Sequence, residues 1–85
     1  MKKEQYNNIN KNFSIIDLRD RNEYLKNHFS NSINIPYDVL MSNYKNILVK
    51  NKCYYIICSK GKLSKRAASM LNYFGYNIIV IEKKV

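Results

Sequence analysis

Short apolar runs alternate with amphipathic segments along most of this chain. The apolar runs are brief and rich in Ile, Val and Tyr, which is typical of strands buried in a sheet. Between them, apolar residues recur at the three- and four-residue spacing of helices, most clearly over 37–49. In chain order the pattern predicts strands over 13–18, 33–35, 54–58 and 77–82, separated by helices over 21–28, 37–49 and 64–74.

Strands that alternate with helices in this way form βαβ units, whose strands are parallel. We therefore expect an α/β fold with a small, mostly parallel sheet of about four to five strands and helices on both faces. No linker, repeat or domain boundary is visible in the sequence. We expect a polar arm over 1–12 and a single domain over 13–85 that is short at its C-terminal side.

Polar residues mark where two of these helices begin and end. Asp20 is a candidate N-cap, and Glu23 stands three residues later as its capping-box partner. Gly75 directly follows the last predicted helix, where a glycine in the left-handed region commonly ends a helix.

The composition narrows the class of protein. Eighty-five residues with 46% hydrophobic content can build one small core, and no apolar run approaches the length of a membrane span. The N-terminus lacks the apolar region of a secretory signal, so we expect a cytoplasmic protein that does not contact a membrane. The net charge of +9 is spread along the chain, which favours solvated side chains over a nucleic-acid surface. The exception is a basic cluster formed by Lys60, Lys62, Lys65 and Arg66.

The two cysteines require separate explanations. Cys53 and Cys58 lie on one predicted strand, roughly 16 Å apart at the usual rise per residue, and their odd spacing places them on opposite faces. A disulfide between them is therefore excluded. His28 is the only histidine and there is no Cys-x-x-Cys pair, so we expect no metal site.

Cys58 is the candidate nucleophile. It ends an apolar strand and is followed by a cationic loop with Gly61, and then by a helix whose N-terminus favours negative charge. Because the thiolate is the reactive form of cysteine, these surroundings favour a reactive thiol. The competing interpretation is a small buried side chain that only packs. The candidate substrate-binding loop consists of Ser59, Lys60, Gly61, Lys62, Leu63 and Ser64.

Two blocks of this sequence resemble the rhodanese-like domain, a single-domain sulfurtransferase fold. The first block contains Ile16-Asp17-Leu18-Arg19, then Glu23-Tyr24, His28 and finally Asn34-Ile35-Pro36. The second block is the loop that begins at Cys58. The resemblance implies that Cys58 takes a sulfane sulfur from a small anionic donor such as thiosulfate, or from a persulfide, and passes it to a thiol acceptor. It implies no cofactor, and it allows a protein partner in a sulfur relay.

The resemblance also assigns roles around the loop. Asp17 is expected to brace the loop by hydrogen bonds, although ordinary turn chemistry at a strand end is the alternative. Arg19 supports the loop region and is expected to pair with Glu23. His28 is expected to be structural. Ser64 is either the N-cap of the following helix, which we favour, or a hydroxyl donor near the sulfur.

Departures from the family pattern keep other functions open. Ser59 replaces a frequent arginine, Leu63 replaces a frequent polar residue, and the usual last helix is missing. We therefore expect either reduced stability or a partner that covers part of the sheet. The alternative function is a catalytically weak interaction module that docks a protein through its basic loop face. A cysteine phosphatase or arsenate reductase is disfavoured, because Leu63 cannot clamp an oxyanion and Arg66 lies within the predicted helix. RNA binding could only add to sulfur transfer, and nucleic acid is not the expected partner.

Overall fold

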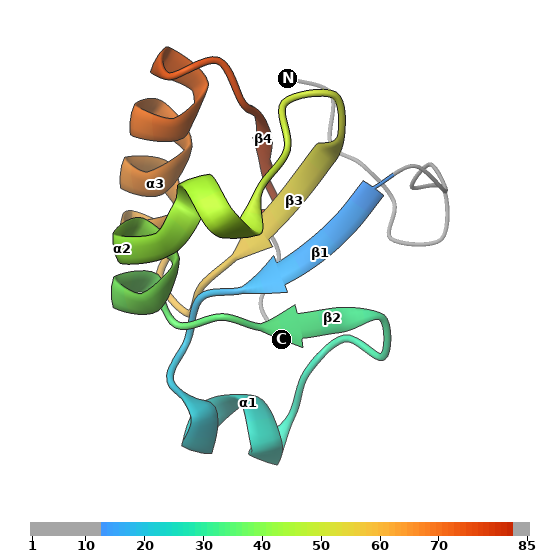
Figure 1. Cartoon of the computed structure of the whole chain (residues 1–85). Helices are drawn as coiled ribbons and strands as arrows, with labels where there is room; N and C mark the ends of the chain where they lie inside the picture. Colours follow the sequence, from blue (N-terminus) through green and yellow to red (C-terminus); the bar gives the residue numbers. More distant parts are fainter. Residues whose placement is uncertain (1–12, 83–85) are drawn as a thin grey trace.

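The computed structural model describes residues 13–82. The strands of this region form a single sheet in the order β2-β1-β3-β4, and each neighbouring pair is parallel (Figure 1). This architecture confirms the α/β class and all seven predicted segments, with ends shifted by a few residues. The predicted arm over 1–12 lies outside the described residues. The elements are β1 (Phe13–Asp17), α1 (Arg21–Lys26), β2 (Ser32–Asn34), α2 (Tyr37–Ile47), β3 (Cys53–Ile57), α3 (Lys62–Tyr73) and β4 (Asn77–Val80).

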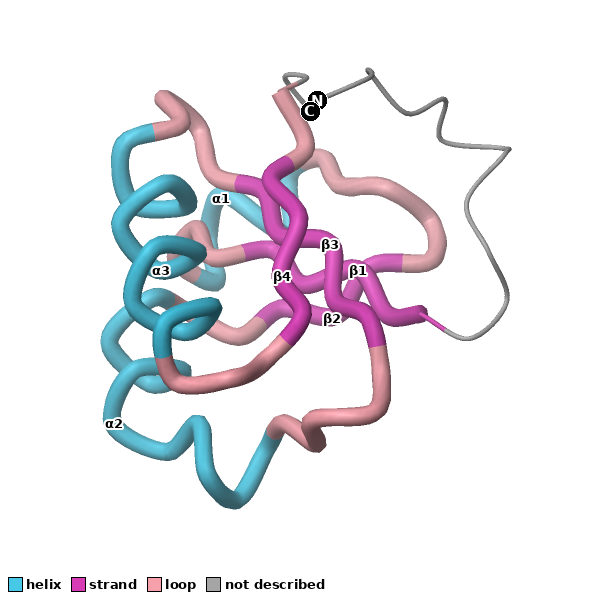
Figure 2. Tube along the Cα trace, turned by 90° about the horizontal axis from the view of Figure 1, so that it is seen from above, coloured by secondary structure: helices cyan, strands magenta, loops and turns pink. Residues whose placement is uncertain are grey.

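The helices are distributed less evenly than the sequence predicted. Helices α2 and α3 lie side by side against one face of the sheet (Figures 1 and 2). Helix α1 lies beyond the edge strand β2, and none of its 6 residues is buried. Within residues 13–82, helices on both faces are therefore not found. The reason is length, because fewer than two turns of helix cannot cover a sheet face.

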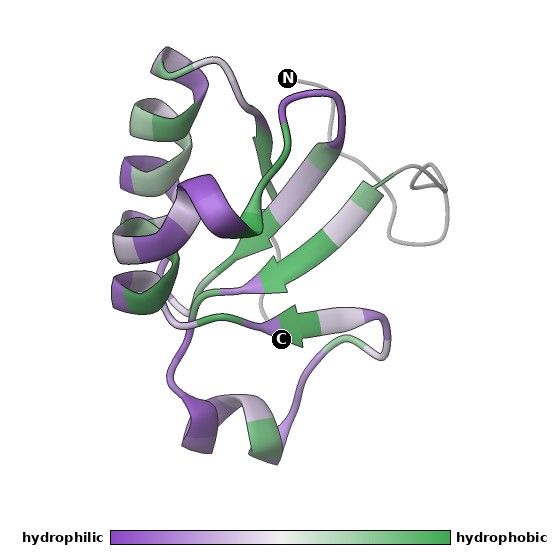
Figure 3. Cartoon of the chain, in the orientation of Figure 1, coloured by the Kyte–Doolittle hydropathy of each residue, from purple (hydrophilic) through white to green (hydrophobic). Residues whose placement is uncertain are grey.

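The core lies between the sheet and the helices α2 and α3. Side chains of a strand point alternately to its two faces, and one set from each of β1, β3 and β4 faces these helices. Figure 3 shows hydrophobic residues gathered on the strands, whereas α1 is mostly hydrophilic. The buried cluster contains Ile16, Leu18, Tyr54, Ile56, Cys58 and Ile78 from the sheet and Leu40, Ala67, Ala68 and Leu71 from the helices. Cys58 thus faces the helices, while Cys53 points to the other face, as its odd spacing predicted.

The ends of two helices follow from single residues. Asp20 caps α1 by accepting a hydrogen bond from the Glu23 amide at 2.9 Å, as predicted. At the end of α3, Gly75 adopts the left-handed region with φ of 100°, and its amide donates to the Asn72 carbonyl. The Tyr76 amide donates to the Leu71 carbonyl, which completes a Schellman motif and confirms the predicted helix end.

No helix within residues 13–82 could traverse a bilayer, since even α3 has only 12 residues and carries several charges.

Candidate active site

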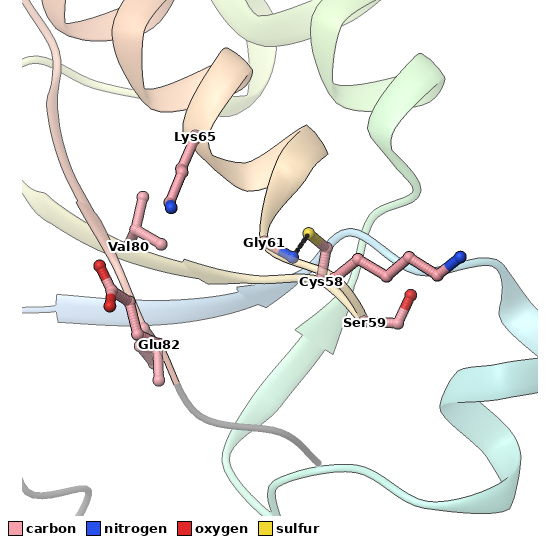
Figure 4. Close-up of a pocket in the computed structure, with 8 residues that line it drawn as sticks. Cys58, Ser59, Gly61, Lys65, Val80 and Glu82 are labelled. Atoms are coloured by element: carbon pink, nitrogen blue, oxygen red, sulfur yellow. Dashed lines mark hydrogen bonds between the residues drawn. The ribbon is translucent and has the colours of Figure 1, made fainter.

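Cys58 lies at the point where β3 ends and the chain turns toward α3. Strand β3 pairs with β1 on one side and with β4 on the other, so it is an interior strand of the sheet. Cys58 directly follows its carboxyl end. Parallel α/β sheets commonly place their sites at this end of their strands. The side chain is 9% exposed, and Figure 4 shows its sulfur beside the first turn of α3.

The sulfur of Cys58 is surrounded by hydrogen-bond partners from the loop and from α3. The amide of Gly61 donates to Sγ at 3.1 Å, and the amide of Ser64 donates to it at 3.3 Å. The Cys58 thiol donates to Ser64 Oγ at 3.3 Å, and that hydroxyl donates to the Gly61 carbonyl at 3.2 Å. When the thiol is deprotonated, the Ser64 hydroxyl can turn to donate to the sulfur instead. The arrangement therefore suits a negatively charged sulfur.

Two opposing effects act on the pKa of the Cys58 thiol. Burial raises it, because a charged sulfur is less well solvated inside the protein. The hydrogen bond with the Ser64 side chain and the amides of Ser64, Lys60 and Gly61 lower it, and together they outweigh burial. The net pKa lies below that of an ordinary thiol, so a larger fraction of Cys58 is thiolate near neutral pH.

Gly61 determines the path of the chain around the sulfur. Its φ of 76° lies in the left-handed region, which glycine adopts without steric cost. This conformation turns the Gly61 amide toward Sγ and lets α3 begin at Lys62. The expectation that Ser64 caps the helix is therefore wrong, because the glycine starts α3 earlier. Ser64 lies fully buried in its first turn and takes the other predicted role, that of a hydroxyl beside the sulfur.

Replacing Gly61 with alanine should strain the loop without creating a clash. A Cβ at this position would have nothing within 4 Å, so the cost of about 1–2 kcal/mol comes from the left-handed backbone alone. Relaxation of that strain would turn the amide away from Sγ and slow alkylation of Cys58. Gly75→Ala is the matched control, because it carries similar strain far from the sulfur. Both variants should lose stability in urea, and equal alkylation rates in the two would contradict this account.

Ser64→Ala removes the side chain that contributes most to lowering the pKa of Cys58. We expect the midpoint of pH-dependent alkylation to move upward, measured in a Cys53→Ser background so that Cys58 is the only thiol. Without the Ser64 change, the folded protein should react at lower pH than the same protein unfolded in urea, since its thiol pKa is lowered on folding. An unchanged midpoint in Ser64→Ala would show that the hydroxyl does not act on the sulfur.

A hollow of ≈ 220 Å³ opens beside Cys58 (Figure 4). Ser59, Lys60 and Gly61 line it from the loop, and Lys65 lines it from α3. Val80 and Glu82, at the end of β4, were not among the predicted site residues. Only the predicted topology indicated them, because a parallel sheet brings the carboxyl ends of neighbouring strands to the same edge.

Within residues 13–82, the side chains of Asp17 and Arg19 form no hydrogen bond with the loop over 59–64. The Asp17 carboxylate is fully buried and accepts from the Arg19 amide, Nε and Nη2 at 2.9 to 3.1 Å. This pair was not predicted from the sequence. A pairing of Arg19 with Glu23 was predicted instead, and it is found as a weaker contact at 3.9 Å. Hydrogen bonding to Asp17 raises the pKa of Arg19. The pair holds the turn after β1, and support of the loop by these residues stays a prediction.

The only histidine lies at the end of α1 and is exposed. The ring of His28 stacks on Tyr24 with centroids 3.7 Å apart, and its Nδ1 lies 2.5 Å from the Tyr24 carbonyl oxygen. These contacts agree with a structural role. Within residues 13–82 no group of His, Cys, Asp and Glu side chains could hold a metal ion.

Comparisons with known proteins agree with this architecture. The family model for the rhodanese-like domain matches residues 1–83. A tRNA sulfurtransferase from Thermoplasma acidophilum is 40% identical over 67 residues, which are 79% of this chain but 13% of that protein. A rhodanese-related protein from Thermoplasma volcanium is 35% identical, with a TM-score of 0.77 over 87% of this chain and 73% of its own. The single-domain sulfurtransferase RDL2 of Saccharomyces cerevisiae shares the fold at 19% identity, with a TM-score of 0.71 over 92% of this chain and 74% of its own. This chain belongs to the rhodanese-like domain family.

Proposed function

We propose that the chain is a sulfurtransferase or sulfur carrier that uses Cys58. The observation that carries this proposal is the set of amide and hydroxyl groups around Sγ, which lowers the pKa of the thiol. Such donors stabilise negative charge on the attacking sulfur and on a persulfide formed from it. Membership of the family and the relative named as a sulfurtransferase support the same class of reaction.

The reaction takes place in two balanced steps. In loading, the Cys58 thiolate forms a bond to the sulfane sulfur of thiosulfate, the bond from that sulfur to the sulfite group breaks, and sulfite leaves with the electron pair. In discharge, an acceptor thiolate bonds to the terminal sulfur of the Cys58 persulfide, and the Cys58 thiolate leaves. A persulfide donor loads Cys58 in the same way, with a thiolate as the leaving group.

The loop supplies charge for both steps. Lys60 and Lys62 are exposed beside Cys58, where they raise the local concentration of an anionic donor. The amides of Gly61 and Ser64 hold the charged sulfur in place between the steps. No metal or organic cofactor is needed for either step.

The whole-protein activity of the Thermoplasma acidophilum relative is not transferred to this chain, which corresponds to 13% of its length. Thiosulfate or a persulfide is proposed as the donor, and a thiol as the acceptor. The acceptor can be a small molecule or a cysteine of a relay partner.

The test is sulfite release from thiosulfate by the purified chain. Without an acceptor we expect a single equivalent of sulfite per protein, because Cys58 is loaded once and then stops. With dithiothreitol as acceptor, release should continue at a steady rate. No release beyond that of Cys58→Ser would exclude thiosulfate as the donor. Failure of a small-molecule persulfide to load Cys58 as well would overturn the proposal and favour the docking module instead.

A further inference from the structure

A second and larger cleft borders Cys58. It has a volume of ≈ 620 Å³ and lies between the turn after β1, the start of α2 and the first turns of α3. Cys58, Ser59 and Lys60 line both this cleft and the hollow of Figure 4. A cleft of this size is typical of sites for organic ligands and is much larger than a small inorganic anion requires. The cleft therefore offers room for the acceptor of the proposed sulfur transfer.

Part of the lining of the cleft is apolar and open to solvent. Leu63, which replaces a frequent polar residue of the family pattern, is 38% exposed at the start of α3. Pro36 and Tyr37, at the start of α2, line the same cleft. An exposed leucine gains free energy when an apolar group of a ligand covers it. These residues favour an acceptor with an apolar group near its thiol.

The other part of the lining is cationic. Lys60, Lys62 and Arg66 line the cleft, and none of them forms an ion pair within residues 13–82. Arg19 also lines it but is neutralised by the buried Asp17.

The acidic side chains of the cleft come from α1, its N-cap and α2, whereas these cations come from the loop and α3. The Glu23 carboxylate lies 3.9 Å from both Arg19 and Lys26, and the Asp20 carboxylate accepts the cap hydrogen bond of α1. Asp38, in the first turn of α2, is then the one acidic residue of the lining outside these contacts. The lining as a whole carries four cations and three carboxylates, so its charges nearly cancel. The charges are separated, however, and Lys60, Lys62 and Arg66 lie on the side of the loop and α3, next to Cys58, where they attract acidic groups of a ligand and repel basic ones.

We infer that the acceptor is a cysteine in an acidic polypeptide segment, with an apolar residue next to the cysteine, bound in this cleft. The inference rests on the proposed function, since it names the acceptor of the Cys58 persulfide. The thiolate of the segment bonds to the terminal sulfur, and the Cys58 thiolate is released. An RNA strand would also match the cations, but it has no aliphatic side chain to cover Leu63, so the lining favours a polypeptide.

The experiment measures discharge of the preloaded protein to two synthetic peptides. Each contains one cysteine followed by leucine; one has flanking aspartates and the other has lysines in their place. Loading with thiosulfate is first verified by mass spectrometry. At low salt we expect discharge to the acidic peptide to be about tenfold faster, and the difference should shrink as salt is added.

Variants assign this preference to the cleft. In Lys62→Glu/Arg66→Glu the preference should disappear or reverse, whereas Lys45→Glu, on the exposed end of α2 outside the cleft, should keep it. Leu63→Ser should slow discharge to the acidic peptide more than to a version with serine in place of its leucine.

The outcomes separate the inference from the function on which it rests. A protein that loads from neither thiosulfate nor a small-molecule persulfide would overturn the proposed function. A protein that loads but discharges to both peptides and to 2-mercaptoethanol at equal rates would overturn only the inference and indicate a small-molecule acceptor.

Discussion

Cys58→Ser is expected to abolish sulfur transfer, with sulfite release from thiosulfate falling to the rate without protein. A serine hydroxyl is not ionised near neutral pH and forms no persulfide, so neither step of the reaction can occur. The fold should survive, because the two side chains are similar in size and the amides of Gly61 and Ser64 can donate to a hydroxyl. Transfer is measured with dithiothreitol as acceptor, and folding by urea denaturation.

Cys53→Ser is the matched control for this substitution. Cys53 begins β3 on the opposite face of the sheet and is only partly buried. Its replacement should leave loading and discharge of Cys58 intact. Transfer that depended on Cys53 would contradict the assignment of a single reactive cysteine.

Arg19→Met is expected to produce the largest loss of stability. The buried Asp17 carboxylate would lose its charged partner and three of the hydrogen bonds that it accepts. Removing one partner of a buried ion pair costs about 3 kcal/mol, a large fraction of the stability of a small domain. Urea denaturation should show a lower midpoint with little change in slope.

Two further variants make this expectation specific. Arg21→Met removes an exposed arginine that forms no ion pair within residues 13–82, and it should change stability little. Asp17→Asn combined with Arg19→Met should recover part of the loss, because a neutral amide no longer needs a cation. Equal stability of Arg19→Met and Arg21→Met would show that the Asp17 charge is compensated in another way.

The order of helices and strands was predictable because the apolar spacing reports local structure directly. The left-handed Gly75 was predictable as well, since a left-handed backbone at a helix end selects glycine. Cys58 could be placed at the sheet edge because it follows an apolar strand and precedes a glycine loop.

The details that were wrong or missing depend on tertiary contacts. The early start of α3, and with it the position of Ser64 beside the sulfur, depends on the exact turn at Gly61. The Asp17–Arg19 pair forms because the chain after β1 brings the guanidinium back over the strand end, which spacing alone does not show. Val80 and Glu82 reach the site only through the pairing of β3 with β4.

The most direct test of a sulfur-carrying Cys58 is mass spectrometry of the protein after exposure to thiosulfate. Chymotryptic cleavage after Tyr54 or Tyr55 places the two cysteines on separate peptides. We predict that the peptide containing Cys58 gains the mass of one sulfur atom, that the peptide containing Cys53 does not, and that dithiothreitol removes the added sulfur. A Cys58 peptide left unmodified by thiosulfate and also by a small-molecule persulfide, in a folded protein, would contradict the central claim.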